Sequence, residues 1–175
     1  MIHPTAIIGP NVEIEEGAFV GPFCVIGQPA EHPRQATTST GKVVIRKGAR
    51  LTKLVTVDSP LESTGITYIG PNCYLMAHSH VGHDATLSEH VTLACGAKIG
   101  GHAKVEARSN IGLNAVVHQH SVVPTGTMLA ASAFYKGADG GAFQVWAGVP
   151  ARPIKENTVL MDRLEEEGLS AKDYE

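Results

Sequence analysis

Aromatic residues make up only 5% of this 175-residue sequence, and it has three cysteines, an odd number. Cysteines in odd number and without regular spacing indicate no disulfide framework and favour a reducing cytoplasmic location. No run of about 18 apolar residues is present, so we expect no membrane span. A net charge of −3 provides no basic surface for phosphate backbones, so we expect no nucleic-acid partner.

What the sequence has instead is a six-residue repeat. An aliphatic residue recurs at every sixth position, without a break, at Ile69, Leu75, Val81, Leu87, Leu93, Ile99, Val105, Ile111, Val117, Val123 and Leu129. A residue that is nearly always small follows four positions after each, and the same pattern opens the chain between Ile2 and Ile26. Such internal repeats indicate a solenoid.

A period of six fits neither an α-helix nor a long alternating strand. It fits a three-sided coil of 18 residues, in which each hexad forms one short strand and Gly or Asn supplies positive φ at the corners. Successive coils would stack about 4.8 Å apart, with ladders of Ile, Leu and Val filling the interior. Known hexapeptide-repeat proteins wind left-handed, so we predict an all-β, left-handed parallel β-helix.

The repeat is interrupted twice, at about residues 28–44 and 58–68, where Pro, Ser, Thr, Gly and Glu indicate loops. Both loops are expected on the face of the hexads that begin at Val81, Ile99 and Val117. We assign residues 1–150 to the β-helix and residues 151–175 to a C-terminal extension. This extension should contain a short helix that Asn157 caps.

Histidines are concentrated near the middle of the chain. Residues 18 apart should lie above one another, which places Asp84, His102 and His120 in one column and His83, Gly101 and Gln119 in the next. His80 and His118 lie beside these columns. Three interpretations remain open for this cluster: general base catalysis by His83 with a carboxylate partner, a zinc site, or a polar wall between subunits.

One part of the sequence resembles a known enzyme family. The segment YLMAHSHVGHDATLSEHVTLACGAKIGGHAKVEARSNIGLNAVVHQHSVV is similar to the catalytic coils of the UDP-N-acetylglucosamine O-acyltransferases of lipid A biosynthesis. The opening IHPTAIIGPNV and VGPFCVIG resemble the first coils of that family. The most specific part is HxxHD, followed by GGH and VHQ.

This resemblance implies a cytoplasmic homotrimer with active sites between subunits, no bound cofactor and no metal ligands. It implies transfer of an acyl group from an acyl carrier protein thioester, or acyl-CoA, to a UDP-sugar. The catalytic set would be His83 as general base, Asp84 as its orienting carboxylate and the Gly101 N–H as oxyanion donor. The implied substrate-binding residues are His80, His102, His118, Gln119, Arg34, Asn157 and Arg163.

The sequence also departs from the family. It is about two coils shorter near the N-terminus, it has only about 20 residues after Lys155, and His32 replaces an acidic residue that binds the sugar. Three alternatives therefore stay open: an acetyl-CoA-dependent sugar acetyltransferase, which the AGVPARPIK segment also permits, a zinc hydratase of the same fold, and a trimeric protein without catalysis.

Overall fold

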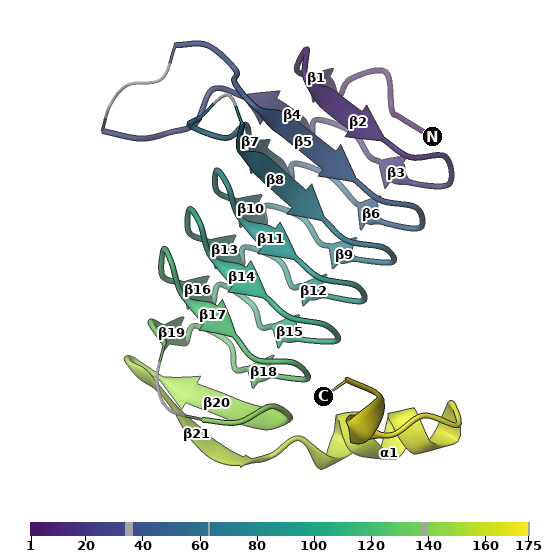
Figure 1. The fold of residues 1–175 in the computed structure, drawn as a ribbon, viewed down its shortest axis with the longest axis vertical. Coiled ribbons are helices and arrows are strands. Elements are labelled where there is room, and N and C mark those ends of the chain that lie inside the picture. Colours follow the sequence, from purple (N-terminus) through teal and green to yellow (C-terminus); the bar gives the residue numbers. More distant parts are fainter. Residues whose placement is uncertain (34–36, 63, 138–139, 175) are drawn as a thin grey trace.

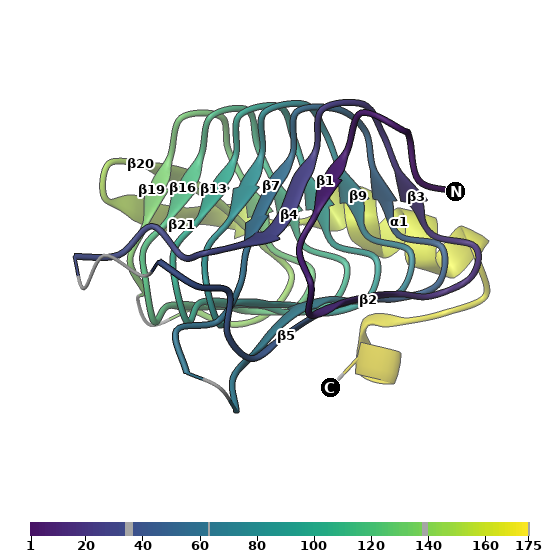
Figure 2. The same cartoon turned by 90° about the horizontal axis from the view of Figure 1, so that it is seen from above.

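The computed structural model describes residues 1–33, 37–62, 64–137 and 140–174. They form a three-sided solenoid of short parallel strands, with a strand hairpin and a helix at its C-terminal end (Figure 1). Seen from the N-terminal end, the coils wind left-handed (Figure 2). The predicted left-handed parallel β-helix is confirmed.

Three parallel sheets form the three sides. The first sheet contains β1 (Ile7–Ile8), β4 (Val25–Gln28), β7 (Thr56–Asp58), β10 (His80–Val81), β13 (Lys98–Ile99), β16 (Val116–Val117) and β19 (Phe134–Tyr135). The second contains β2 (Val12–Ile14), β5 (Lys42–Ile45), β8 (Ile66–Ile69), β11 (Thr86–Leu87), β14 (Lys104–Val105) and β17 (Val122–Val123). The third contains β3 (Phe19–Val20), β6 (Arg50–Leu51), β9 (Tyr74–Leu75), β12 (Thr92–Leu93), β15 (Asn110–Ile111), β18 (Met128–Leu129), β20 (Gln144–Gly148) and β21 (Ala151–Glu156).

The register follows the 18-residue count. Val81 of β10 pairs with Ile99 of β13, which pairs with Val117 of β16. These three side chains point inward and are fully buried, as are the other repeat residues from Ile69 to Leu129 on all three faces. Burial of each such side chain contributes about 1.5–3 kcal/mol, which explains how a core with few aromatics suffices.

Both interruptions leave the solenoid at one corner. Residues 29–41 connect β4 to β5, and residues 59–65 connect β7 to β8, so each loop passes from the first sheet to the second. Figure 2 shows the two loops projecting from the same side of the coils. Because residues 82–85 and their equivalents in later coils turn at this same corner, the loops lie beside the histidine columns.

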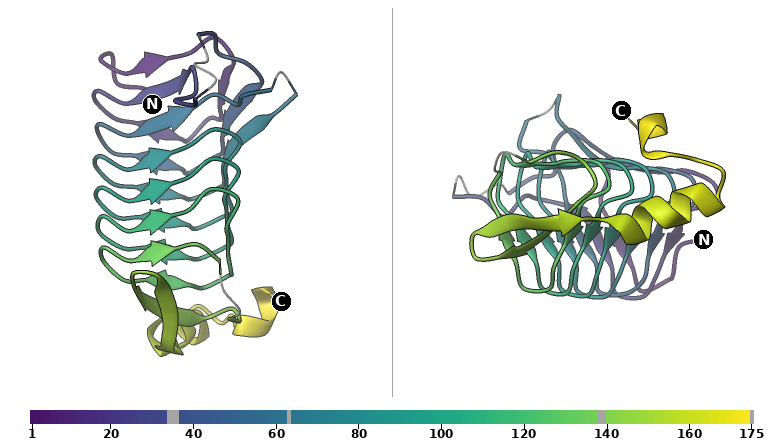
Figure 3. Two further views of the ribbon diagram at one scale, coloured as in Figure 1. Left: turned by 90° about the vertical axis from the view of Figure 1, so that its left-hand side faces the viewer. Right: turned by 90° about the horizontal axis from the view of Figure 1, so that it is seen from below.

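The C-terminal end of the solenoid is covered by β20 and β21, which form an antiparallel hairpin added to β18 (Figure 3). Trp146 of β20 is fully buried, and its ring packs edge-on against Tyr135 with 5.1 Å between the ring centres. Helix α1 (Thr158–Glu166) follows, with Asn157 as its N-cap as predicted, and a 3-10 helix η1 (Ala171–Tyr174) comes last. The hairpin spans the expected boundary after residue 150. The division of the chain at that point stays a prediction.

Candidate active site

The corner between the first and second sheets forces an unusual backbone conformation on the residues that turn there. Asp84, His102 and His120 all have positive φ, between 57° and 61°. Asp and His tolerate this left-handed region better than most residues with a Cβ. The sequence suggested Gly or Asn at such turns, whereas this corner uses Asp and His. Their side chains are therefore stacked in one column by the backbone itself.

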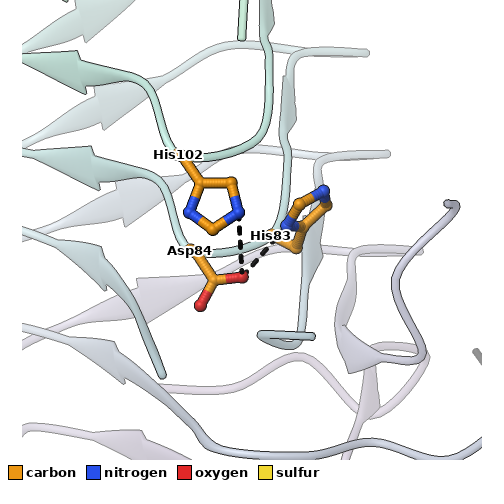
Figure 4. Close-up of side chains that lie close together, drawn as sticks. All are labelled: His83, Asp84 and His102. Atoms are coloured by element: carbon orange, nitrogen blue, oxygen red, sulfur yellow. Dashed lines mark hydrogen bonds and ion pairs between the residues drawn. The ribbon is translucent and has the colours of Figure 1, made fainter. Parts of the chain in front are cut away.

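His83 and Asp84 form a closely contacting pair. Nδ1 of His83 lies 3.0 Å from Oδ2 of Asp84, and His83 is only 7% exposed. The same carboxylate oxygen lies 3.9 Å from Nε2 of His102, so Asp84 stands between two imidazoles (Figure 4). This arrangement holds the His83 ring in one orientation and leaves its other nitrogen, Nε2, for another partner.

Asp84 is itself fixed by neighbouring backbone. Its Oδ2 accepts the N–H of Leu61, and its own N–H donates to Oγ1 of Thr67. A Cβ on Gly65 would overlap the other carboxylate oxygen of Asp84. Leu61 and Gly65, in the connection between β7 and β8, therefore pack directly on this carboxylate and restrict it.

The remaining imidazoles surround the pair. The rings of His102 and His120 are stacked, with 4.7 Å between their centres, and His102 meets His83 edge-on at 5.0 Å. His32 contacts His83 edge-on from the other side, with ring centres 5.4 Å apart. Burial lowers the pKa of His102, an effect that the Asp84 charge partly opposes. His102 therefore favours its neutral form at pH 7.

Gly101 lies against the outer end of the His83 ring, whose Nε2, Cε1 and Cδ2 atoms occupy the space that a side chain at position 101 would need. Its amide nitrogen lies only 2.9 Å from where a Cβ on Gly82 would stand. Glycine at these positions lets consecutive coils approach closely and leaves a backbone amide beside the imidazole. The predicted neighbours His83 and Gly101 are thus on one wall of the solenoid.

Two cavities meet at this wall. A groove of about 610 Å³ runs along the first sheet and is lined by Asp58, His80, His83, Lys98, Gly101, His118, Gln119 and others. A smaller cavity of about 260 Å³ at the corner itself is lined by His32, Leu61, Glu62, His83, His102, Gln119 and His120. His83, His32 and Gln119 border both cavities.

Sequence reasoning missed Asp58 as part of the site. Its carboxylate lies 3.9 Å from Nε2 of His80 and accepts the N–H of Glu31. Burial raises the pKa of Asp58, and the nearby His80 opposes this shift. His80 also contacts Oγ1 of Thr56 through Nδ1. The position of Asp58 at the end of β7, next to a loop outside the repeat, gave no periodic signal.

The other predicted residues are distributed differently. His118 and Gln119 are exposed in the groove, and Nδ1 of His118 lies 3.0 Å from the Gln119 carbonyl oxygen. Asn157 and Arg163 instead line a separate pocket of about 500 Å³ between α1 and the third sheet, with Arg108. Arg34 lies outside the described residues.

Comparisons with known proteins come from sequence and from structure. No family model matches the chain. The UDP-N-acetylglucosamine O-acyltransferase of Alkalilimnicola ehrlichii is 31% identical over 155 residues, which cover 67% of this chain and 60% of the relative. The same enzyme of Sinorhizobium fredii is 26% identical over 176 residues, which cover the whole chain and 61% of the relative. The names of both relatives give an acyl carrier protein as the acyl donor.

A solved UDP-N-acetylglucosamine acyltransferase from Bacteroides fragilis has a TM-score of 0.77 at 20% identity, and the match covers 99% of this chain and 66% of that one. This match shows the common fold. The chain spans 45–61% of the length of the first four curated relatives. No helix among the described residues is long and apolar enough to cross a membrane. In sequence and in its left-handed parallel β-helix, the chain is therefore similar to the UDP-N-acetylglucosamine O-acyltransferases over most of its own length.

Proposed function

We propose that this protein transfers an acyl group from an acyl carrier protein thioester to a hydroxyl or amine of a UDP-sugar such as UDP-N-acetylglucosamine. The observation that carries this proposal is the His83–Asp84 pair, with 3.0 Å between Nδ1 and Oδ2, beside Gly101 in an open groove. The names and sequences of the relatives support the substrate class. The cytoplasmic location stays a prediction.

The roles follow from the geometry of the pair. When His83 donates Nδ1–H to Asp84, Nε2 carries a lone pair and can accept the proton of the attacking hydroxyl or amine. The acceptor oxygen or nitrogen then bonds to the thioester carbon, the carbon–sulfur bond breaks, and the departing thiolate takes the proton from His83. Asp84 stabilises the transient imidazolium, and the Gly101 N–H donates to the developing oxyanion.

The groove residues provide the binding surface. We assign His80, His102, His118 and Gln119 to contacts with the acceptor and the acyl chain, since they border the cavities that meet at His83. Asn157 and Arg163 belong to a different pocket of the same subunit. They contribute to this acceptor only across a subunit boundary, which is why we propose a homotrimer with sites between subunits.

The test is replacement of His83. His83→Ala should abolish formation of acylated UDP-sugar, measured by mass spectrometry, while light scattering shows an unchanged oligomer. His78→Asn provides the control, since His78 is an exposed histidine outside both cavities. Near-normal activity of His83→Ala would overturn the assignment. Parallel reactions with acyl carrier protein thioesters and acetyl-CoA identify the donor.

A further inference from the structure

Three potential metal ligands come together at the corner of the solenoid. Nitrogens of His83 and His102 and a carboxylate oxygen of Asp84 all lie within 4.8 Å of one another. The measured separations from Oδ2 of Asp84 are 3.0 Å to Nδ1 of His83 and 3.9 Å to Nε2 of His102. Figure 4 shows both imidazoles directed at this one carboxylate.

These ligand atoms suit zinc. Zinc binds imidazole nitrogen and carboxylate oxygen at about 2.0–2.2 Å, usually with four ligands in tetrahedral arrangement. Small rotations of the three side chains would place their ligand atoms around one ion and leave a fourth position for water. Magnesium and calcium prefer sites made of oxygen ligands and fit this set poorly.

We infer that His83, Asp84 and His102 form a zinc site whose occupation switches off acyl transfer. The inhibition part of this inference rests on the proposed function, whereas the binding part does not. Zinc here acts as an inhibitor and has no role in the reaction itself.

The reason for inhibition is a conflict between two tautomers of His83. As a general base, His83 carries its proton on Nδ1 and donates it to Asp84, which leaves Nε2 free. As a zinc ligand through Nδ1, it needs a lone pair on that nitrogen and must carry its proton on Nε2. Zinc also occupies the carboxylate oxygen that would stabilise the imidazolium. The two states therefore exclude each other.

Access to the ligands does not require the substrate groove. The cavity of about 260 Å³ at the corner is lined by His83, His102 and His120, whereas His102 and His120 do not line the larger groove. An ion that enters there leaves most of the groove open to substrate. We therefore expect zinc to lower kcat. KM should rise as well, because the ion occupies His102, which we assign to substrate contacts.

Binding is tested with zinc chloride and with cobalt(II) as a spectroscopic probe. The protein carries Cys95→Ser, because the exposed Cys95 thiol is itself a potential zinc ligand. Calorimetry should show one zinc ion per chain, and cobalt should give the visible absorption of a four-coordinate site. His102→Asn and Asp84→Asn should each lower the zinc affinity at least about tenfold, because even loss of a contact that only supports a ligand lowers metal affinity 10–100-fold.

Asparagine is the substitute because positions 84 and 102 both have positive φ, which asparagine tolerates. His78→Asn is the matched control, since His78 also has positive φ and is exposed, and it should keep the zinc affinity. No saturable zinc binding, or equal binding in His102→Asn and the parent, overturns the site.

Inhibition is tested by initial rates of product formation with zinc and again after a chelator. The parent and His78→Asn should lose kcat as the site fills and recover it fully with chelator. His102→Asn should need at least about tenfold more zinc than the parent to lose the same fraction of its own metal-free rate. If zinc binds but kcat does not change, the inhibitory role is wrong. If no protein shows activity even without zinc, the proposed function fails, while the calorimetric result still decides the site.

Discussion

The imidazole of His83 lies so close to Gly101 that a Cβ at position 101 would stand 2.5 Å from Nε2 and 2.6 Å from Cε1. These are the atoms at the end of the ring that faces the proposed acceptor. Position 101 therefore determines where the base can lie, in addition to offering its N–H. A single methyl group at this position would test that relationship.

Gly101→Ala should force the His83 ring away from its present place while leaving the core untouched. Displacement of a catalytic group by about 1 Å can cost 10²-fold, so we expect kcat to fall by at least about that factor. Steady-state rates with acyl carrier protein thioester and UDP-N-acetylglucosamine measure the loss. Gly141→Ala is the control, since no atom lies within 4 Å of a Cβ there. Equal activity of both variants would show that the contact is unimportant.

Asp58 provides a prediction about pH. Burial raises its pKa in the folded state, so the folded protein holds this proton more tightly than the unfolded chain does. The contribution of protonated Asp58 to stability is therefore fully present below pH 3.8, the pKa of this carboxyl in the unfolded chain. It is lost as the pH rises through the higher pKa of the folded protein. At neutral pH the buried carboxylate therefore opposes folding.

Asp58→Asn should remove this opposition and keep an oxygen that accepts the Glu31 N–H. The gain in unfolding free energy over the parent should be largest near pH 7 and shrink as the pH falls toward 4. Urea unfolding at several pH values gives this difference. Asp162→Asn, at an exposed position of α1, reports the effect of losing one surface charge. A difference for Asp58→Asn that grows as pH falls would contradict the sign.

The register of the solenoid could be predicted from the sequence because it depends only on the periodic core. Each buried aliphatic residue, such as Val81 or Ile99, must point inward, so an unbroken count of 18 fixes which residues stack. The proximity of His83 to Gly101 and of His102 to His120 followed from that count alone. Side chains outside the core were placed without any knowledge of loops.

The rest of the site depends on segments that lie outside the six-residue repeat. His32 and Asp58 approach the cluster because two loops leave the same corner, and their paths depend on contacts such as Leu61 with Asp84. Likewise, Asn157 was correctly placed as a helix cap, but the position of α1 beside the third sheet follows from the hairpin that precedes it. Hexad counting contains no information about these paths.

The positive φ at this corner limits which residues can replace His120 without loss of stability. His120 has φ of +61°, in a region that β-branched residues adopt only with strain of about 1–3 kcal/mol. His120→Val should therefore lose about that much unfolding free energy. His120→Asn loses the same stacking contact with His102 but tolerates the backbone, so its loss should stay below about 0.5 kcal/mol. Chemical unfolding compares the two, and equal losses would mean that stacking, not backbone conformation, decides the preference for His.

Asn157 combines a structural and a proposed binding role, and two substitutions separate them. Its Oδ1 accepts the Leu160 N–H at the start of α1, and its Nδ2 donates to the Gly126 carbonyl oxygen at 2.8 Å. Asn157→Ala removes both contacts and should cost about 1 kcal/mol of stability. Asn157→Asp keeps the cap but removes the amide donor.

If Asn157 also contacts the nucleotide across a subunit boundary, both variants should raise KM for the UDP-sugar while kcat changes little, because the contact is remote from the thioester. Ser170→Ala, which removes a hydroxyl that donates to Asp173 in the C-terminal segment, is the control for a local loss of stability without loss of the pocket. An unchanged KM in Asn157→Asp, together with a lowered melting temperature in Asn157→Ala, would limit Asn157 to capping α1. The acceptor would then be held by residues of the histidine wall alone.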